Sequence, residues 1–191
     1  MLTDALAFLV DVIFSLLVYA AMLRFVMQWL RAPFRNPLGQ SVAALTDWAI
    51  KPLRRMLPGF GGFDWASLVF AWVVQALWLL ALAALRGGAP VSGALVAMIA
   101  VLAMVELLKV AIWILIVAVF LQAILSWVAP DGPLAGVLNA LTFRFLAPVR
   151  RIVPPLGGTL DLSPMIVFIV AMLVLKVPIA WLEQTVVAAF R

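Results

Sequence analysis

Long uninterrupted apolar runs are the feature that most constrains what this chain can fold into. Four runs cover residues 5–30, 64–86, 91–129 and 163–190, and a helix needs about 20 apolar residues to cross a bilayer. In the whole chain 68% of residues are hydrophobic and 11% are charged, against about half and about a quarter in a soluble domain. We therefore predict an all-α membrane protein with about four transmembrane helices. No Lys or Arg precedes the first run, so we expect a retained signal-anchor helix.

The third run is too long for one simple span. As a single helix, residues 91–129 would measure roughly 58 Å at about 1.5 Å per residue, against a hydrocarbon core of about 30 Å. Two interpretations stay open: one long helix that projects from the membrane, or a separate short or re-entrant segment followed by a span. We assign 87–105 to a turn with an extra apolar segment, and 106–129 to the span.

The chain contains neither Cys nor His. Their absence excludes thiol nucleophiles, disulfides and acid–base catalysis by His. It also excludes the usual zinc ligand sets and iron centres held by Cys or His. No glycine-rich phosphate-binding motif occurs, so we expect no enzymatic activity, no cofactor and no metal. The net charge of +5 is explained by basic loops on a membrane protein, and we expect no nucleic-acid partner.

Eight of the thirteen basic residues lie in two loops rich in Pro and Gly, 31–63 and 130–162. In the first loop Asn36 is a candidate helix N-cap and Pro37 a candidate first helical residue. An apolar helix face follows in each loop: Leu38, Val42, Leu45, Ala49 and Leu53 in the first, and Leu134, Leu138, Leu141, Phe145, Val149 and Ile152 in the second. Such helices can lie in the membrane interface or pack on the chain's own spans, and both can hold.

The two loops repeat one another. The pattern P-x-R-R-x-x-P-x-x-G-G begins at Pro52 and again at Pro148, and each copy is followed by an Asp and a Ser before an apolar run. We predict repeat 1 over 1–86 and repeat 2 over 106–191, each consisting of a span, a basic loop and a span. Because cytoplasmic loops carry an excess of Lys and Arg, both loops are expected in the cytoplasm. The repeats would then be parallel.

These motifs resemble the YggT family of bacterial inner-membrane proteins, which has chloroplast relatives. The matching residues are Arg24, Trp29, Asn36, Pro37, Pro52, Pro58, Gly62, Asp64 and Ser67 in repeat 1, and Ser126, Trp127, Pro133, Pro148, Pro154, Gly158, Asp161, Ser163 and Pro164 in repeat 2. The arginine often found before the Ser-Trp pair in this family is Gln122 in repeat 2. If that arginine has a role, only Arg24 can serve it here.

The resemblance implies location in the bacterial inner membrane and no enzyme activity. Members of the family have been linked to osmotic stress tolerance, and relatives to cell division or to the organisation of membrane complexes.

The paired arginines of the repeated motif are the foremost candidates for a binding role. Together with two neighbouring basic residues they form a candidate set for anionic lipid headgroups or an acidic partner: Arg54, Arg55, Arg150, Arg151, Arg31 and Lys51. The alternative is that these charges only fix the topology. Other membrane proteins, or a second copy of the chain, are further candidate partners.

Among the charged residues of the apolar runs, five are candidate intramembrane charges: Asp11, Glu106, Lys109, Lys176 and Glu183. Such residues pair with one another, reach for the interface, or mark a pathway. Glu106 and Lys109 are three residues apart and can pair, and Lys176 and Glu183 share a helix face. A small-ion or osmolyte transporter is therefore the alternative function, and with four helices it would need to be oligomeric.

We expect Pro178 to kink the last span, and Asp64, Asp161 and Ser163 to act as helix caps.

Overall fold

A computed structural model describes residues 2–85, 92–154 and 161–190, whose regular elements are all helical. Their order is α1 (Leu2–Trp29), α2 (Pro37–Met56), α3 (Trp65–Leu85), α4 (Gly93–Val128), α5 (Ala135–Ile152), α6 (Ser163–Val174), the π-helical turn η1 (Leu175–Ile179) and α7 (Ala180–Ala189). Within these ranges four stretches are long and apolar enough to cross a membrane: Ala5–Trp29, Trp65–Leu85, Gly93–Val128 and Ser163–Ala189. The predicted all-α membrane fold is confirmed.

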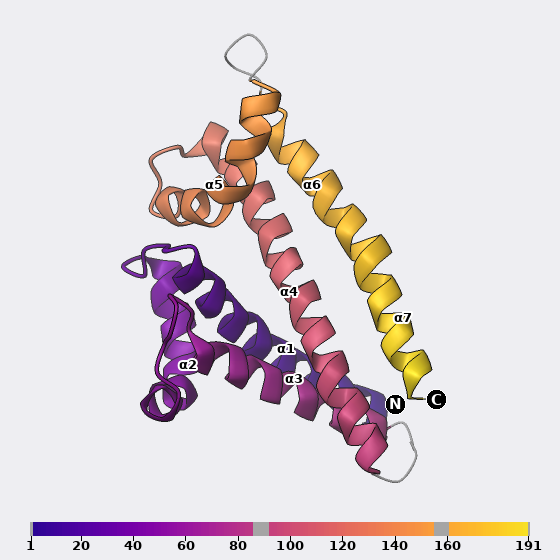
Figure 1. Cartoon of the computed structure of the whole chain (residues 1–191). Helices are drawn as coiled ribbons and strands as arrows, with labels where there is room; N and C mark the ends of the chain where they lie inside the picture. The colour runs from indigo at the N-terminus through magenta and orange to yellow at the C-terminus, as the bar shows by residue number, and fades with distance from the viewer. Residues whose placement is uncertain (1, 86–91, 155–160, 191) are drawn as a thin grey trace.

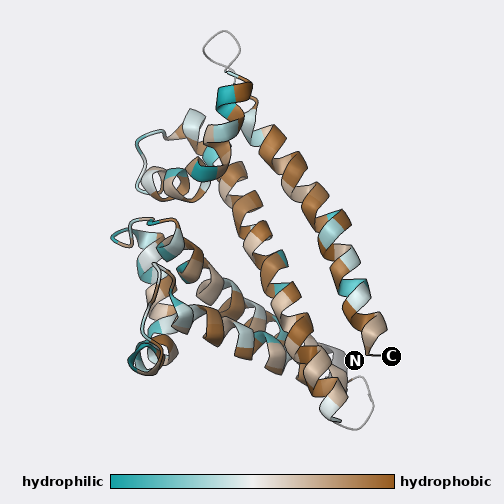
Figure 2. Cartoon of the chain, viewed as in Figure 1, coloured by the Kyte–Doolittle hydropathy of each residue, from teal (hydrophilic) through white to brown (hydrophobic). Residues whose placement is uncertain are grey.

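Each repeat is a pair of long helices joined by a shorter one. α2 connects α1 to α3, and α5 connects α4 to the helix formed by α6, η1 and α7. The two termini lie toward one end of the molecule, and α2 and α5 lie away from that end (Figure 1). Hydrophobic residues dominate the long helices, while hydrophilic residues gather on and around α2 and α5 (Figure 2). Large side chains such as Phe8, Phe120 and Leu173 are exposed along the spans, as lipid contact requires.

The third apolar run forms one helix. α4 extends without a break over 36 residues, and the Oγ of Ser92 caps it by accepting a hydrogen bond from the Leu95 N–H at 3.2 Å. Its first part packs on α3, where the indole of Trp72 donates to the carbonyl of Ala100 at 2.9 Å. The extra segment expected over 87–105 is therefore, from Gly93 onward, continuous with the span, and no separate re-entrant segment exists there. Residues 87–91 lie outside the described part of the chain.

Pro178 lies in a local change of helix type within the last span. The chain forms one π-helical turn over Leu175–Ile179, with Pro178 inside it. Proline has no N–H to donate within a helix, and a π-turn redistributes the hydrogen bonds around such a position.

The short helix α2 begins as predicted, and its buried stripe coincides in part with the predicted apolar face. Asn36 Oδ1 accepts from the N–H of Gly39 at 2.9 Å, and Pro37 opens the helix. The buried stripe is Gly39, Val42, Thr46 and Ile50. Leu38 and Leu53 of the predicted apolar face pack against the core, whereas Leu45 of the same face is exposed. The helix is rotated because Thr46 turns toward a buried arginine of α1, described below.

The helix α5 follows the predicted pattern more closely. Its buried residues are Val137, Leu138, Leu141, Thr142 and Leu146, whereas Ile152 at its end is exposed. Thr142 occupies the same place in α5 as Thr46 in α2, so the two short helices use the same kind of buried face.

The core is unequally shared between the repeats. The main cluster combines α1, α3, the middle of α4 and the start of α5, with Ala21 of α1 and Ala71 of α3 both fully buried. Small residues of this kind let membrane helices approach closely. Repeat 2 adds only a small cluster of Val119, Leu146 and Val167. The main cluster therefore joins the two repeats to one another.

Candidate functional site

The repeated motif, as it stands in repeat 1, builds a buried polar cluster around Arg24. This side chain lies near the end of α1 and is only 5% exposed. Its Nη1 donates to Thr46 Oγ1 at 2.8 Å and to Asp47 Oδ1 at 2.7 Å. Its Nε lies 3.9 Å from Asp64 Oδ2. One guanidinium thus ties α1 to α2 and to the residue that precedes α3.

Asp64 joins a second arginine to this cluster. Arg54 of α2 donates through Nε to Asp64 Oδ1 at 3.2 Å, and its Nη2 contacts Asp64 Oδ2. The same Nη2 donates to Gln28 Oε1 at 3.0 Å. Asp64 also caps α3, since it accepts from the N–H and the hydroxyl of Ser67. Its predicted capping role is present, whereas no local pattern indicates that it is also the counter-ion of two arginines.

The electrostatics of the cluster favour charged carboxylates. Burial by itself would raise the pKa of Asp64, but hydrogen bonds from Arg54 and Ser67 and the charge of Arg54 outweigh it and hold that pKa below its usual range. A hydrogen bond from Lys51, supported by Arg24, lowers the pKa of Asp47 against the opposing effect of burial. Both groups are therefore ionised at neutral pH, and the cluster is a network of formed ion pairs.

Repeat 2 builds a reduced version of the same cluster. Arg150 donates through Nε to Asp161 Oδ2 at 2.9 Å, and its Nη2 lies 2.8 Å from the same oxygen. Asp161 accepts from the N–H of Ser163 at 2.9 Å. Burial would raise the pKa of Asp161, but the hydrogen bonds from Ser163 and Arg150 and the charge of Arg150 lower it overall. Ser163 is the first residue of α6, and its own hydroxyl, expected to cap the helix, is buried with no hydrogen-bond partner among the described residues.

Two residue differences between the repeats explain why the cluster of repeat 2 is smaller. Gln122 stands where repeat 1 has Arg24, and its side chain contacts the Thr142 hydroxyl. Phe143 stands where repeat 1 has Asp47. The arginine and its carboxylate partner are thus both missing, so the cluster beside α5 keeps only the ion pair of Arg150 with Asp161 among its described residues.

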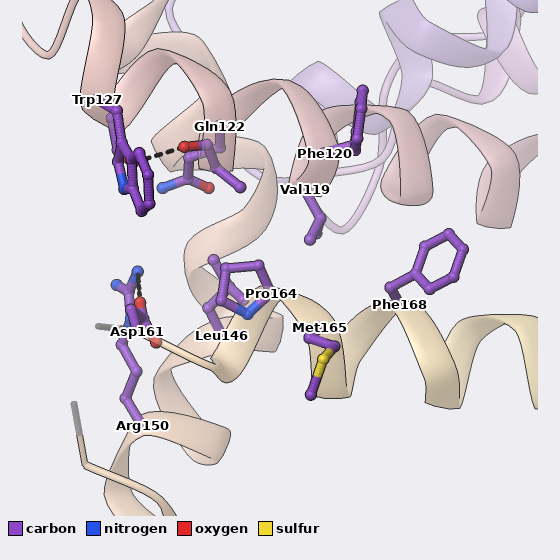
Figure 3. A pocket seen from close by; sticks show the side chains of 12 residues that line it. Val119, Phe120, Gln122, Trp127, Leu146, Arg150, Asp161, Pro164, Met165 and Phe168 are labelled. Atoms are coloured by element: carbon purple, nitrogen blue, oxygen red, sulfur yellow. Dashed lines mark hydrogen bonds and ion pairs between the residues drawn. The ribbon is translucent and has the colours of Figure 1, made fainter. Parts of the chain in front are cut away.

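A cavity of about 480 Å³ opens beside this reduced cluster, between α4, α5 and α6. Figure 3 shows Arg150 and Asp161 at one side of it, with Trp127 and Gln122 nearby and Met165 and Phe168 along α6. Ser126 and Pro164 of the family motif also line it. The cavity is mainly apolar with a polar edge, which suits an amphipathic molecule better than a small ion.

The paired arginines divide into an inward and an outward member. Arg54 and Arg150 are engaged by Asp64 and Asp161, whereas Arg55 and Arg151 are exposed. Arg31 is exposed too, and Lys51 forms an exposed bridge to Asp47 at 2.8 Å. Only part of the predicted binding set is therefore free to meet a lipid or a partner, because Arg54 and Arg150 already form ion pairs within the chain.

Arg144 is a basic residue that sequence reasoning passed over. Its guanidinium carbon lies 5.6 Å from the ring centroid of Trp29, which ends α1. The only available signal was its place in the second basic loop, because Arg144 has no counterpart in the repeated motif.

The remaining motif residues mostly shape the backbone. Pro52 and Pro148 lie inside α2 and α5, while Pro58 and Pro154 follow the ends of these helices. Gly62 adopts a φ of 83°, which favours glycine and turns the chain back toward α3. Pro133 precedes α5, and Trp127 is exposed at the end of α4. Gly158 lies outside the described residues.

The five candidate intramembrane charges do not all lie together. Lys109 Nζ lies 2.7 Å from Glu106 Oε1 and 2.6 Å from Glu183 Oε2. The expected pairing of Glu106 with Lys109 is thus present, and Glu183 joins Lys109 rather than Lys176. Lys176, in η1, and Asp11, in α1, are exposed. Among the described residues no group of three metal-ligating side chains comes together.

Comparison with known proteins matches this arrangement to one family. The profile of the CCB3/YggT family matches residues 3–85 and 101–182, one segment for each repeat. The chain is similar to a protein of Vibrio alginolyticus named "Uncharacterized protein in proC 3'region", with 36% identity over 167 residues, 87% of this chain and 89% of the relative. "Uncharacterized protein PA0392" of Pseudomonas aeruginosa is 34% identical over 91% of this chain and 87% of its own length.

"Uncharacterized protein YggT" of Escherichia coli strain K12 is 34% identical over 85% of this chain and 83% of its own length. No solved structure matches the chain. The family profile covers both halves of the molecule, and these relatives cover most of its length. The chain belongs to the CCB3/YggT family of membrane proteins.

Proposed function

We propose that this protein is a non-enzymatic membrane protein that meets the anionic cytoplasmic membrane surface with the end formed by α2 and α5, and organises membrane complexes there. The observation that carries the proposal is the division of each arginine pair. One member is used inside the chain, by Asp64 or Asp161, and the other is left exposed. An arginine that only fixed topology would need no such repeated placement.

The charge balance at this end supports the proposal. Asp47, Asp64 and Asp161 are all engaged by basic side chains of the same chain. Asp131, the other carboxylate of this end, is exposed, and it is outnumbered by five exposed arginines, which leave a surplus of positive charge: Arg31, Arg35, Arg55, Arg144 and Arg151. Each basic residue close to an anionic membrane surface contributes about 1 kcal/mol of attraction.

Exposed apolar side chains lie beside these charges. Trp48 and Met56 of α2, Phe60 after it and Ile152 at the end of α5 are 66–82% exposed. A helix with apolar and basic faces of this kind binds at the boundary between headgroups and acyl chains. The role in osmotic tolerance or in complex assembly is supported by the family resemblance.

A complementation experiment tests the proposal. In a bacterium lacking its own family member, the variant R55Q/R151Q should fail to restore growth under osmotic stress, while D131N, which also removes an exposed charge, should restore it. Full complementation by R55Q/R151Q would overturn the proposal.

Topology is measured in the same strains, because an inverted protein would mean that the arginines only set orientation. The chain has no Cys, so single cysteines report cleanly. G136C, at the start of α5, should be labelled only from the cytoplasm, and S92C, at the start of α4, only from outside. Unchanged labelling in R55Q/R151Q together with lost growth is the expected result.

The transport alternative gains no support from the charged residues of the spans. Both carboxylates of the Glu106–Lys109–Glu183 trio contact the same ammonium group, so each is held in an ion pair within the chain although one negative charge of the trio stays uncompensated. Glu106 is also roughly 32 Å along α4 from Trp127, at about 1.5 Å per residue. This length is close to the full thickness of the hydrocarbon core, so Glu106 lies far from the end formed by α2 and α5. Ion flux into liposomes that is abolished by Glu106→Gln would overturn this assignment in favour of transport.

A further inference from the structure

We propose that a groove between the two repeats is a binding site for the phosphate group of one anionic phospholipid. The groove has a volume of about 660 Å³ and lies between the end of α1, the turn that precedes α3, and α5. Arg31, Arg144 and Arg151 line it together with Trp29, Phe63 and Phe143. The inference rests on the proposed function and narrows it from a charged surface to a single site.

Charge is the first argument for a bound anion. Three arginines line the groove, and its lining includes no Asp or Glu. Within the described part of the chain, no carboxylate lies within ion-pair distance of any of the three. Three neighbouring guanidiniums repel one another, and an anion held between them relieves that repulsion.

The placement of Arg144 is the second argument. Its guanidinium stacks over the indole of Trp29 at 5.6 Å. A guanidinium that rests on an aromatic face keeps its N–H groups at its edge, where they can donate to phosphate oxygens in pairs. Trp29 comes from repeat 1 and Arg144 from repeat 2, so the site exists only where the repeats meet.

The backbone around Arg31 is the third argument. The N–H of Ala32 donates to the Met27 carbonyl at 2.8 Å, and the N–H of Arg31 donates to the Gln28 carbonyl at 3.1 Å. This is the hydrogen-bond pattern of a helix end that normally carries glycine, and Arg31 adopts it with a φ of 55°. A strained non-glycine residue in such a place indicates a functional use of its side chain.

The groove's composition favours a lipid over a soluble phosphate. Apolar side chains form much of the wall, among them Leu30, Phe63, Ala140 and Phe143. Trp29 ends a membrane span, and tryptophan at such a position lies at the level of the headgroups. A phospholipid would place its phosphate among the arginines and the upper part of its acyl chains on this apolar wall.

Native mass spectrometry of the full-length protein tests the site. We expect the wild-type protein to retain one phosphatidylglycerol and to prefer it to phosphatidylcholine. R31Q/R151Q and R144Q should each lower the affinity for phosphatidylglycerol by about tenfold or more, the loss expected for one charge-assisted hydrogen bond. R144K keeps the positive charge but loses the planar guanidinium, so its affinity for phosphatidylglycerol should lie between that of R144Q and that of the wild type.

The matched control is R35Q/R55Q, which removes two exposed arginines of the same end that do not line the groove. It should leave retention of one lipid unchanged. Equal losses in R35Q/R55Q and R31Q/R151Q would mean diffuse attraction, which overturns the groove and leaves the proposed function standing. Equal binding of phosphatidylglycerol and phosphatidylcholine by the wild type would overturn both.

Inorganic phosphate is the second probe. At millimolar concentration it should not displace phosphatidylglycerol, because it lacks the acyl chains that contact the apolar wall. Displacement would mean a site for soluble phosphate and would overturn the lipid assignment. An unchanged thermal midpoint in each variant shows that the loss of binding does not come from unfolding.

Discussion

The Nε of Arg24 lies 3.9 Å from Oδ2 of Asp64, and the two side chains are 7% and 2% exposed. Asp64 holds Arg54 as well. One buried carboxylate therefore balances two guanidiniums from two helices, while it also caps a third. In repeat 2 the corresponding Asp161 balances only Arg150.

Replacing Asp64 by Asn should destabilise the protein far more than the same change at Asp161. Asp64→Asn removes the buried carboxylate that Arg54 binds and leaves Arg24 with Asp47 alone, and removing one member of a buried ion-pair network costs about 3 kcal/mol. Asp161 and Arg150 are 26% and 37% exposed, so water screens them and the expected cost is about 1 kcal/mol or less. The measurement is the free energy of unfolding in mixed micelles titrated with a denaturing detergent. Asp131→Asn is the control, and equal midpoints for it and Asp64→Asn would contradict the prediction.

Stability should fall on the acid side and stay level near neutral pH. The pKa values of Asp47, Asp64 and Asp161 are lowered in the folded state, relative to about 3.9 in the unfolded chain. Such groups stabilise fully above the unfolded pKa and lose this contribution as the pH falls through the folded pKa. The chain has no His, so no side chain with an ordinary pKa near 6.5 titrates between pH 5 and 8.

The thermal midpoint measured from pH 8 to pH 3 checks this pH dependence. The wild-type midpoint should be flat to about pH 5 and then decline. Asp64→Asn should begin lower and decline less, because one of the responsible carboxylates is gone. A wild-type midpoint that rises on acidification would contradict the assignment.

The membrane fold and the two repeats could be predicted because they depend on local patterns. Apolar runs longer than a bilayer require helices, and the cap at Asn36 followed from a side chain and the next few residues. The continuity of α4 could not be decided in this way, because apolar residues there are compatible with either alternative. What holds its first part is a contact of Ala100 with Trp72, far away in the sequence.

The ion-pair cluster was hidden for a different reason. Asp64 has a sufficient local explanation as a cap, so nothing in the sequence demanded a second role for it. One signal was nonetheless present. Repeat 2 has Gln122 in place of Arg24 and Phe143 in place of Asp47, and a basic residue lost together with an acidic one indicates that the two pair in repeat 1. The rotation of α2, which exposes Leu45 and buries Thr46, follows from that same pair.

Restoring the arginine in repeat 2 should succeed only if its partner is restored too. Gln122→Arg alone places a guanidinium beside Phe143, which cannot accept its hydrogen bonds, and should lower the unfolding free energy by about 2 kcal/mol. Adding Phe143→Asp recreates the pair that Arg24 makes with Asp47 at 2.7 Å. The double-mutant cycle should show a favourable coupling of about 1–3 kcal/mol. Additive effects of the two changes would mean that the repeats do not share this geometry.

Removing the single ammonium from the trio in the spans should be more harmful than removing the whole trio. Lys109 contacts Glu106, which also lies in α4, and Glu183 of α7. The second contact ties α4 to α7. Lys109→Met leaves two carboxylates facing each other in an apolar region, and we expect a loss of about 3 kcal/mol in unfolding free energy. The triple variant E106Q/K109M/E183Q carries no charge there and should return to within about 1 kcal/mol of the wild type, because neutral replacements of a partly buried ion group are tolerated. Glu183→Gln should have a small effect on the unfolding free energy, since Glu106 still neutralises Lys109.

Detergent-induced unfolding followed by tryptophan fluorescence gives the unfolding free energy of all three variants. A triple variant no more stable than Lys109→Met would show that the trio contributes through shape or hydrogen bonding and not through charge.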